Sequence, residues 1–253
     1  MTRNFGAAAQ DYAKHRAGFP DSFFDRLQVF GIGRPDQLVV DIGTGTGTLA
    51  RGLALRGCSA VGIDPDERLT EQARQLDHEA GVAVEYQTGV AEQLPLPDDY
   101  ADVITAGTCW HWFDGRRAAA EVRRIGKAGA HVVIAAFAWL PLPGNVVEAT
   151  EKLIEKHNPD WHYGGGNGFY YDCVDHLQDA GIGNIETFSY DVDVPYTPVG
   201  WRGRIRASAG VGASLSTDEV TVFDAELADL LERSFATDLL QVHHRVFAVI
   251  GRV

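Results

Sequence analysis

The fold is decided by the stretch VVDIGTGTG at residues 39–47. Its first half is a short apolar run that ends at Asp41, which is typical of a buried strand. Its second half has glycine at every other position, and a backbone without Cβ atoms can turn sharply and approach a ligand closely. Residues 48–56 then show the apolar spacing of a helix, whose first backbone amides are free donors. The stretch therefore predicts a strand, a ligand-binding turn and a helix in direct succession.

The same alternation continues along the chain to about residue 140. Each apolar run is followed by a turn or by a segment with helical spacing, and strands connected by helices pair in parallel. The expected strands are 37–41, 59–64, 82–86, 101–106 and 131–137, and the expected helices are 48–56, 66–80 and 116–125, with a turn at 126–129 before the last strand. This pattern predicts an α/β fold with a doubly wound sheet.

The two flanks have a different pattern. The first 30 residues are rich in aromatic side chains, so we expect them to pack on another part of the chain, in two pieces separated by Pro20. Beyond Pro143 the expected helices are 145–157, 171–180 and 217–235, the expected strands are 185–194 and 239–253, and 158–168 is a loop. Residues 199–214 fit no single element. No linker is long enough to separate two domains.

Charge and cysteine content narrow the possible functions. The chain of 253 residues has a net charge of −13, which repels a polyanion, so a small-molecule substrate is expected and nucleic acid is not. The three cysteines are far apart and indicate neither a metal site nor a disulfide framework, as in a reducing cytoplasm. No apolar run is long enough for a membrane helix, and the first residues lack the pattern of a signal peptide. A soluble, cytoplasmic protein is the expectation.

Two carboxylates indicate what the turn binds. Asp41 precedes the glycines, and Asp64 ends the next expected strand, where a carboxylate suits two ribose hydroxyls. That much also describes an NAD-dependent oxidoreductase, but the spacing is not the Gly-x-Gly-x-x-Gly of dinucleotide folds. An acid at the first position suits a cation, and S-adenosylmethionine carries an ammonium and a sulfonium but no phosphate. Helix capping or salt bridges are the alternative roles of both carboxylates.

At these residues the chain resembles the class I S-adenosylmethionine-dependent methyltransferase family, strongly over about residues 35–140. VVDIGTGTG is similar to the first motif of the family, and VGIDP at 61–65 to the second. AEQLPLPD at 91–98 is similar to the loop beside the adenine, and RIGKAG at 124–129 to the turn into strand five.

The resemblance implies an architecture. The sheet would be Rossmann-like, seven-stranded and mostly parallel, with an antiparallel last strand and a helical, aromatic insertion after strand five. One domain would cover 1–253. Its parts would be an N-terminal helical cover (1–34), the cofactor-binding core (35–140) and two acceptor-side insertions (141–184 and 195–236).

The resemblance also implies the residues that bind the cofactor, which would leave as S-adenosylhomocysteine. The amino-acid half would lie against the glycine turn, and Asp64 would hold the ribose. Many members have an acid at the position of Val90, so the adenine is expected to be recognised here by backbone groups or by Glu92. The full implied set is Asp41, Gly43, Thr44, Gly45, Asp64, Pro65, Val90, Ala91, Glu92 and Gly107.

The acceptor is expected beside GTCWHWFD at 107–114, because ligands of open α/β sheets bind beyond the carboxyl ends of the strands. Trp110 and Trp112 could pack on a cationic or flat acceptor. His111 is the candidate general base, since histidine ordinarily titrates near neutral pH. In the alternative interpretation these aromatics belong to the core and His111 bonds a backbone carbonyl. Many methyl transfers need no base, because positioning supplies most of the rate.

Further candidates lie near both ends of the chain. WHWFD at 110–114 and YAKHR at 12–16 resemble a subset of the family that includes trans-aconitate methyltransferase-like proteins, which implies that Tyr12 and Arg16 close over the cofactor. Tyr170 is an expected acceptor contact in a segment rich in glycine and aromatic residues, which suggests a mobile lid on the acceptor side; the alternative is an aromatic hairpin core. Arg202 and Arg206 suit a carboxylate or phosphate, or else form a salt-bridged face.

The leading functional prediction is methyl transfer to an oxygen or nitrogen of a small metabolite. Anionic and heteroaromatic metabolites are the acceptors considered. The alternatives are a tRNA or protein methyltransferase and a non-catalytic S-adenosylmethionine-binding regulatory protein. The expected partner is a small-molecule acceptor, without nucleic acid, membrane or metal. The expected assembly is a monomer or a homodimer.

Overall fold

The computed structural model describes residue 15 and residues 17–253, which form two compact units. Unit 2 consists of Gly18–Phe137, Phe169–Tyr190 and Val246–Val253. Unit 1 contains Ala138–Gly168 and Asp191–Arg245, together with residues 15 and 17. Of the first expected insertion, residues 141–168 belong to unit 1 and residues 169–184 to unit 2, and the division into core and insertions stays a prediction.

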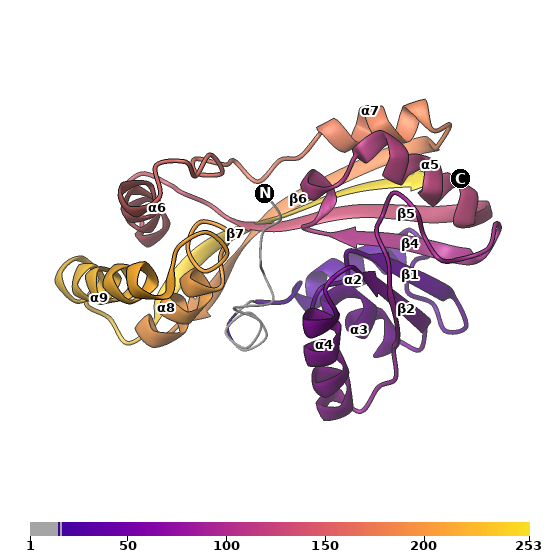
Figure 1. Cartoon of the computed structure of the whole chain (residues 1–253). Coiled ribbons are helices and arrows are strands. Elements are labelled where there is room, and N and C mark those ends of the chain that lie inside the picture. Colours follow the sequence, from indigo (N-terminus) through magenta and orange to yellow (C-terminus); the bar gives the residue numbers. More distant parts are fainter. Residues whose placement is uncertain (1–14, 16) are drawn as a thin grey trace. The chain divides into compact units, whose positions relative to one another are not determined.

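One seven-stranded sheet has the order β3-β2-β1-β4-β5-β7-β6 (Figure 1). β1 pairs in parallel with β2 and β4, β2 with β3, and β4 with β5. β7 runs antiparallel to β5, since Val253 donates to Ala130 while His243 accepts from Leu140. The expected mostly parallel sheet with an antiparallel last strand is confirmed. The strands are β1 Leu38–Ile42, β2 Ser59–Asp64, β3 Glu85–Thr88, β4 Ala101–Gly107, β5 Gly126–Trp139, β6 Gly183–Tyr196 and β7 Leu240–Arg252.

The helices of unit 2 cover both faces of its part of the sheet, as expected for a doubly wound fold. On one face lie α2, α3 and α4, and on the other α5 and α7 (Figure 1). A 3-10 turn, η2, lies between β4 and α5. The bounds are α2 Asp21–Val29, α3 Thr48–Ala54, α4 Glu67–Ala80, η2 Trp110–Trp112, α5 Gly115–Ile125 and α7 Asp172–Asp179.

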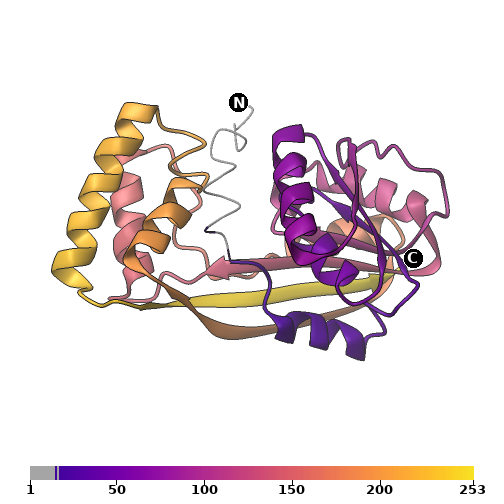
Figure 2. The same ribbon diagram turned by 90° about the horizontal axis from the view of Figure 1, so that it is seen from below.

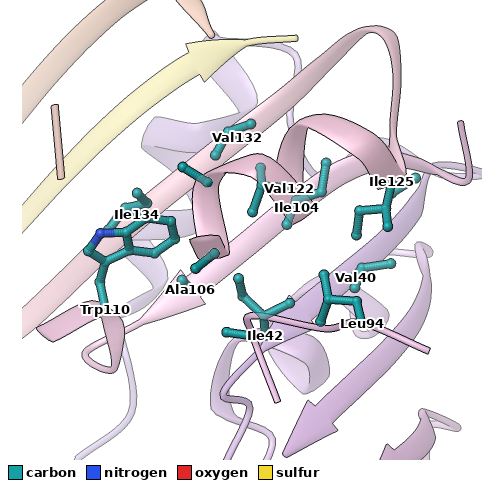
Figure 3. Close-up of a cluster of buried hydrophobic side chains, with 14 of the residues drawn as sticks. Val40, Ile42, Leu94, Ile104, Ala106, Trp110, Val122, Ile125, Val132 and Ile134 are labelled. Atoms are coloured by element: carbon teal, nitrogen blue, oxygen red, sulfur yellow. The ribbon is translucent and has the colours of Figure 1, made fainter. Parts of the chain in front are cut away.

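The core of unit 2 lies between the sheet and α5. Val40, Ile104 and Val132 line the sheet side, and Val122 and Ile125 face them from the helix (Figure 3). These side chains are at most 1% exposed, and each such burial contributes roughly 1.5–3 kcal/mol. The core thus holds the ends of β1, β4 and β5 in fixed positions.

Unit 1 is built around three helices that lie together in Figure 2. They are α6 (Val146–His157), α8 (Pro198–Arg206) and α9 (Thr217–Ser234). α9 packs against both of the others. Trp201 and Phe223 are fully buried between them, and the indole of Trp201 donates to the Thr150 hydroxyl at 3.0 Å.

Three predicted elements differ from the structure. The third strand is 85–88 rather than 82–86, because only these residues pair with β2. The expected turn at 126–129 is part of the strand β5. The strand is irregular there: Gly129 has a φ of +81°, and the register against β4 shifts. Residues 198–206 form a helix, whose N-cap hydroxyl of Thr197 accepts from Gly200 while Pro198 occupies the first turn. Among the helices of the described part, none is long and apolar enough to cross a membrane.

Candidate active site

The candidate site lies in unit 2, at the carboxyl ends of β1, β2 and β4. The turn after β1 is held by its neighbour, since the amide of Thr44 donates to the carbonyl of Ile63 at 3.0 Å. Within the turn, the amide of Gly47 donates to the carbonyl of Thr44 at 2.9 Å. Gly47 has a φ of +77° and precedes α3, so the free amides of that helix begin at the turn.

The three glycines of the turn are required for different reasons. A Cβ on Gly43 would lie 2.8 Å from the ring of Phe113 and 2.9 Å from the sulfur of Cys109, and one on Gly47 would meet the Tyr86 hydroxyl. Among the described residues, a Cβ on Gly45 would meet nothing within 4 Å. Protein packing therefore explains two of the glycines, whereas Gly45 faces open space that a ligand can occupy.

Asp64, at the end of β2, faces this turn. One of its oxygens accepts from the amide of Gly45 at 2.8 Å and the other from the amide of Asp66 at 2.9 Å. The side chain is 7% exposed, and this burial raises the pKa of the carboxyl. Each carboxylate oxygen can accept more than one hydrogen bond, so capacity for two further donors remains. The predicted Asp64 is thus placed beside the open turn.

Asp41 has a different environment from the one expected. Its oxygens accept from the hydroxyls of Thr44 and Thr105, both at 2.6 Å, and it is 2% exposed. Burial raises its pKa from 3.8 to about 6. Asp41 and the Thr44 hydroxyl are thus engaged inside the protein, where they fix the turn, and the cofactor contacts expected for Asp41 and Thr44 stay predictions.

The loop implied to line the adenine is anchored to the start of α5. Glu92 accepts from the amide of Asp114 at 2.7 Å, and Glu121 accepts from the amide of Leu94 at 2.7 Å. Val90 is exposed and Ala91 is buried in the core of unit 2. One oxygen of the Glu92 carboxylate therefore holds the loop in place. Pro65, the other implied adenine neighbour, is exposed directly after β2.

A strained residue follows β4. Gly107 ends the strand, and Thr108 has a φ of +57°, a left-handed conformation that is rare for a β-branched residue. Its amide donates to Ala135 at 2.7 Å, and its hydroxyl accepts from Phe137 at 3.2 Å. Such strain typically costs about 1–3 kcal/mol and concentrates at functional sites. These bonds direct the following segment over the glycine turn, where Cys109 donates to the carbonyl of Ile42.

The aromatic residues of this segment separate into two groups. Trp110 is buried in the core and its indole donates to His176 at 3.2 Å, which favours the core alternative over an acceptor contact (Figure 3). His111, Trp112 and Tyr170 are exposed. The ring of His111 lies 4.4 Å from that of Trp112 and stacks on that of Tyr170 at 6.1 Å. The structure thus brings together three predicted acceptor contacts from distant parts of the sequence.

The predicted arginines lie in unit 1 and are paired. Arg202 and Arg206 both bind the carboxylate of Asp224 on α9, the latter at 2.9 Å. The two ion pairs agree with the alternative interpretation, in which Arg202 and Arg206 form a salt-bridged face. They disfavour a role of the two arginines as acceptor contacts. Tyr12 and Arg16 lie outside the described residues, so their closure over the cofactor remains a prediction.

A hydrogen-bond network that supports the glycine turn was not predicted from the sequence. Arg51 donates to the carbonyl of Thr46 at 2.6 Å and to the carboxylate of Asp77 at 2.7 Å. The hydroxyl of Tyr86 donates to the same carboxylate at 2.8 Å. The one sequence indication is an arginine a single helical turn after Gly47. Among the residues that the structure describes, no group of His, Cys, Asp and Glu could hold a metal ion.

Solved structures with this fold define the class. The crystal structure of YcgJ from Bacillus subtilis has a TM-score of 0.59, with 20% identity, and the match covers 92% of this chain and 98% of that one. A putative type II methyltransferase from Anaeromyxobacter dehalogenans has a TM-score of 0.60, with 20% identity and coverage of 94% and 97%. At these identities the likeness concerns the fold, which is that of the class I methyltransferases.

The sequence of the core is similar to that of a known family. Residues 40–134 match the family model described as a methyltransferase domain. The uncharacterized methyltransferase Rv3342 of Mycobacterium tuberculosis is 31% identical over 132 residues, which are 52% of this chain and 51% of that protein. The chain thus spans about half the length of this curated relative. The trans-aconitate methyltransferase-like subset remains a prediction.

Proposed function

We propose that this protein is an S-adenosylmethionine-dependent methyltransferase that acts on an oxygen or nitrogen of a small metabolite. The observation that carries the proposal is the open space at Gly45 beside the Asp64 carboxylate, within a segment that matches the family model of the methyltransferase domain. A carboxylate with remaining acceptor capacity suits the two ribose hydroxyls.

When bound, S-adenosylmethionine supplies a methyl group on a sulfonium, which passes to the acceptor while the C–S electron pair stays on sulfur. The chain holds the site in position: Asp41 and its two threonine partners fix the turn, and Asp64 holds its far side. An O–H or N–H acceptor loses a proton, for which His111 is the proposed recipient. Trp112 and Tyr170 flank that ring and offer flat surfaces to an acceptor.

Calorimetry tests the cofactor first. S-adenosylmethionine and S-adenosylhomocysteine should both bind, and NAD should not. If neither sulfur compound binds while the protein is folded, the proposal is wrong.

A second experiment separates the acceptor classes. Release of S-adenosylhomocysteine is measured with pools of small metabolites, with tRNA and with protein as acceptors. Product with the metabolite pool is expected. Product with tRNA or protein alone would replace the proposed acceptor class, and cofactor binding without product in all three pools would favour a regulatory protein.

A further inference from the structure

The three arginines of α8 have different partners. Arg202 and Arg206 are one helical turn apart, and both pair with Asp224. Arg204 lies between them in sequence and therefore projects from another side of the helix. Among the described residues, no carboxylate pairs with Arg204, although the chain holds 35 acidic residues against 22 basic ones.

Aromatic side chains surround Arg204 instead. Its guanidinium carbon lies 4.6 Å from the ring centroid of Trp139. The indole of Trp139 donates to Glu151 at 2.8 Å, and the other oxygen of Glu151 accepts from the amide of Gly165 at 2.8 Å. The carboxylate of Glu151 is therefore engaged by these two donors. Apart from its contact with Tyr196, the guanidinium keeps N–H donors for a group from outside.

A second polar group without a partner lies beside it. Tyr196 is 7% exposed, and its hydroxyl makes no hydrogen bond in the described structure. Tyr196 is also the neighbour that partly offsets the effect of burial on the pKa of Arg204, which places the hydroxyl next to the guanidinium. Its ring is fixed against Trp201 at 5.4 Å and His244 at 6.2 Å. A buried hydroxyl without a hydrogen-bond partner is unfavourable, so a ligand that bonds to it is favoured.

We propose that Arg204 and Tyr196 form a binding site in unit 1 for the carboxylate of a small organic acid. The guanidinium presents two parallel N–H donors, which match the two oxygens of a carboxylate, and the phenol adds a third donor. One cation balances one carboxylate charge. A phosphate dianion would keep a surplus negative charge near buried Glu151. The proposal concerns residues of unit 1 alone and does not depend on methyl transfer.

Binding is measured on the full chain by the line width of fluorine NMR signals. The probes are 4-fluorophenylacetate, its neutral amide 4-fluorophenylacetamide, and 4-fluorophenyl phosphate. Broadening by the protein is expected for the carboxylate and should be much weaker for the other two. Equal broadening by the amide would show that only the ring binds, and stronger broadening by the phosphate would show that the site selects phosphate; either result overturns the proposal.

Variants locate the site. Arg204→Met and Tyr196→Phe should each weaken carboxylate binding, the first by about tenfold or more. Arg204→Lys keeps the positive charge but loses the two parallel N–H donors of the guanidinium, so it should also weaken carboxylate binding. It tests the role of Arg204 if the Met variant does not fold. Arg233→Gln, on the exposed side of α9 in the same unit, is the matched control and should bind like the wild type. Undiminished binding by folded Arg204→Lys and Tyr196→Phe would overturn the proposal.

Discussion

The Asp64 carboxylate accepts a hydrogen bond from the backbone amide of Gly45 at 2.8 Å. The end of one strand thereby fixes the turn that follows its neighbour. The same carboxylate is proposed to hold the ribose of the cofactor, so its two functions can be separated by comparing stability with affinity.

Asp64→Ala should weaken binding of S-adenosylmethionine by roughly 1–3 kcal/mol, the scale of hydrogen bonds to a charged group. Calorimetry gives the affinity and thermal unfolding gives the stability. Asp25→Asn, an exposed acid of α2 in the same unit, serves as the control. Unchanged affinity in the Asp64 variant would remove the ribose assignment.

Alanine at Gly45 and at Gly43 should have opposite principal effects. At Gly45 the methyl group enters open space, so the loss of stability should be limited to the cost of a left-handed φ, about 1 kcal/mol, while the cofactor is excluded. At Gly43 it collides with Phe113 and Cys109, so unfolding should occur at a clearly lower temperature. Melting temperature and cofactor affinity of the two variants provide the test. Full cofactor binding by Gly45→Ala would show that the open space is not the cofactor site.

His111→Ala should lower turnover more than cofactor affinity, because His111 is proposed to take the proton of the acceptor and not to hold the cofactor. The rate is measured with the first metabolite that supports product formation. Tyr170→Phe keeps the stacked ring and serves as the comparison. Turnover equal to that of the wild type would restrict His111 to a packing role.

Asp41 should make stability depend on pH. Its pKa is about 6 in the folded chain against an ordinary value of 3.8, so the folded state binds the proton more tightly. This contribution is present below pH 4 and is lost as the pH rises to 6. Relative to Asp41→Asn, the wild type should lose about 3 kcal/mol across that window. Denaturant unfolding of both proteins at pH 4 and pH 7 measures the difference, and parallel pH profiles would contradict it.

Asp77→Ala should be among the most destabilising changes in α4. It removes the partner of Arg51 and Tyr86 in a buried network, and breaking a buried ion pair costs roughly 3–5 kcal/mol. Glu71→Ala, an exposed acid of the same helix, should change the free energy of unfolding by less than about 1 kcal/mol. Similar values for both variants would show that the network does not support the turn.

Local signals explain which elements the sequence predicts well. Asp66 caps α4 by accepting from Arg68, and Gly81 ends the helix with a φ of +70°, so both ends follow from residue types alone. β2 is equally clear because a continuous apolar run stands between a glycine-ended helix and Asp64. The doubly wound sheet then follows from the alternation of elements.

Long-range contacts explain what the sequence does not predict. Asp41 accepts a hydrogen bond from the hydroxyl of Thr105, which lies opposite it because of the register of β1 against β4. Similarly, Trp110 and His111 are adjacent in sequence, but a single 3-10 turn sends one into the core and the other to the surface. Arg204 is the proposed ligand-binding arginine of α8 because Asp224, on another helix, pairs with Arg202 and Arg206. Spacing within one segment carries no information on such partners.

The position of β7 has a consequence for how the chain is made. β7 is the last strand in sequence, yet it lies between β5 and β6 in the sheet. During synthesis, β6 therefore leaves the ribosome before β7, its neighbour in the described sheet, exists, and β6 cannot pair with it until residues 240–252 follow. A ribosome that stalls in this interval exposes a long strand to intermolecular pairing. The nascent chain is thus expected to need protection by a chaperone until its final strand is translated.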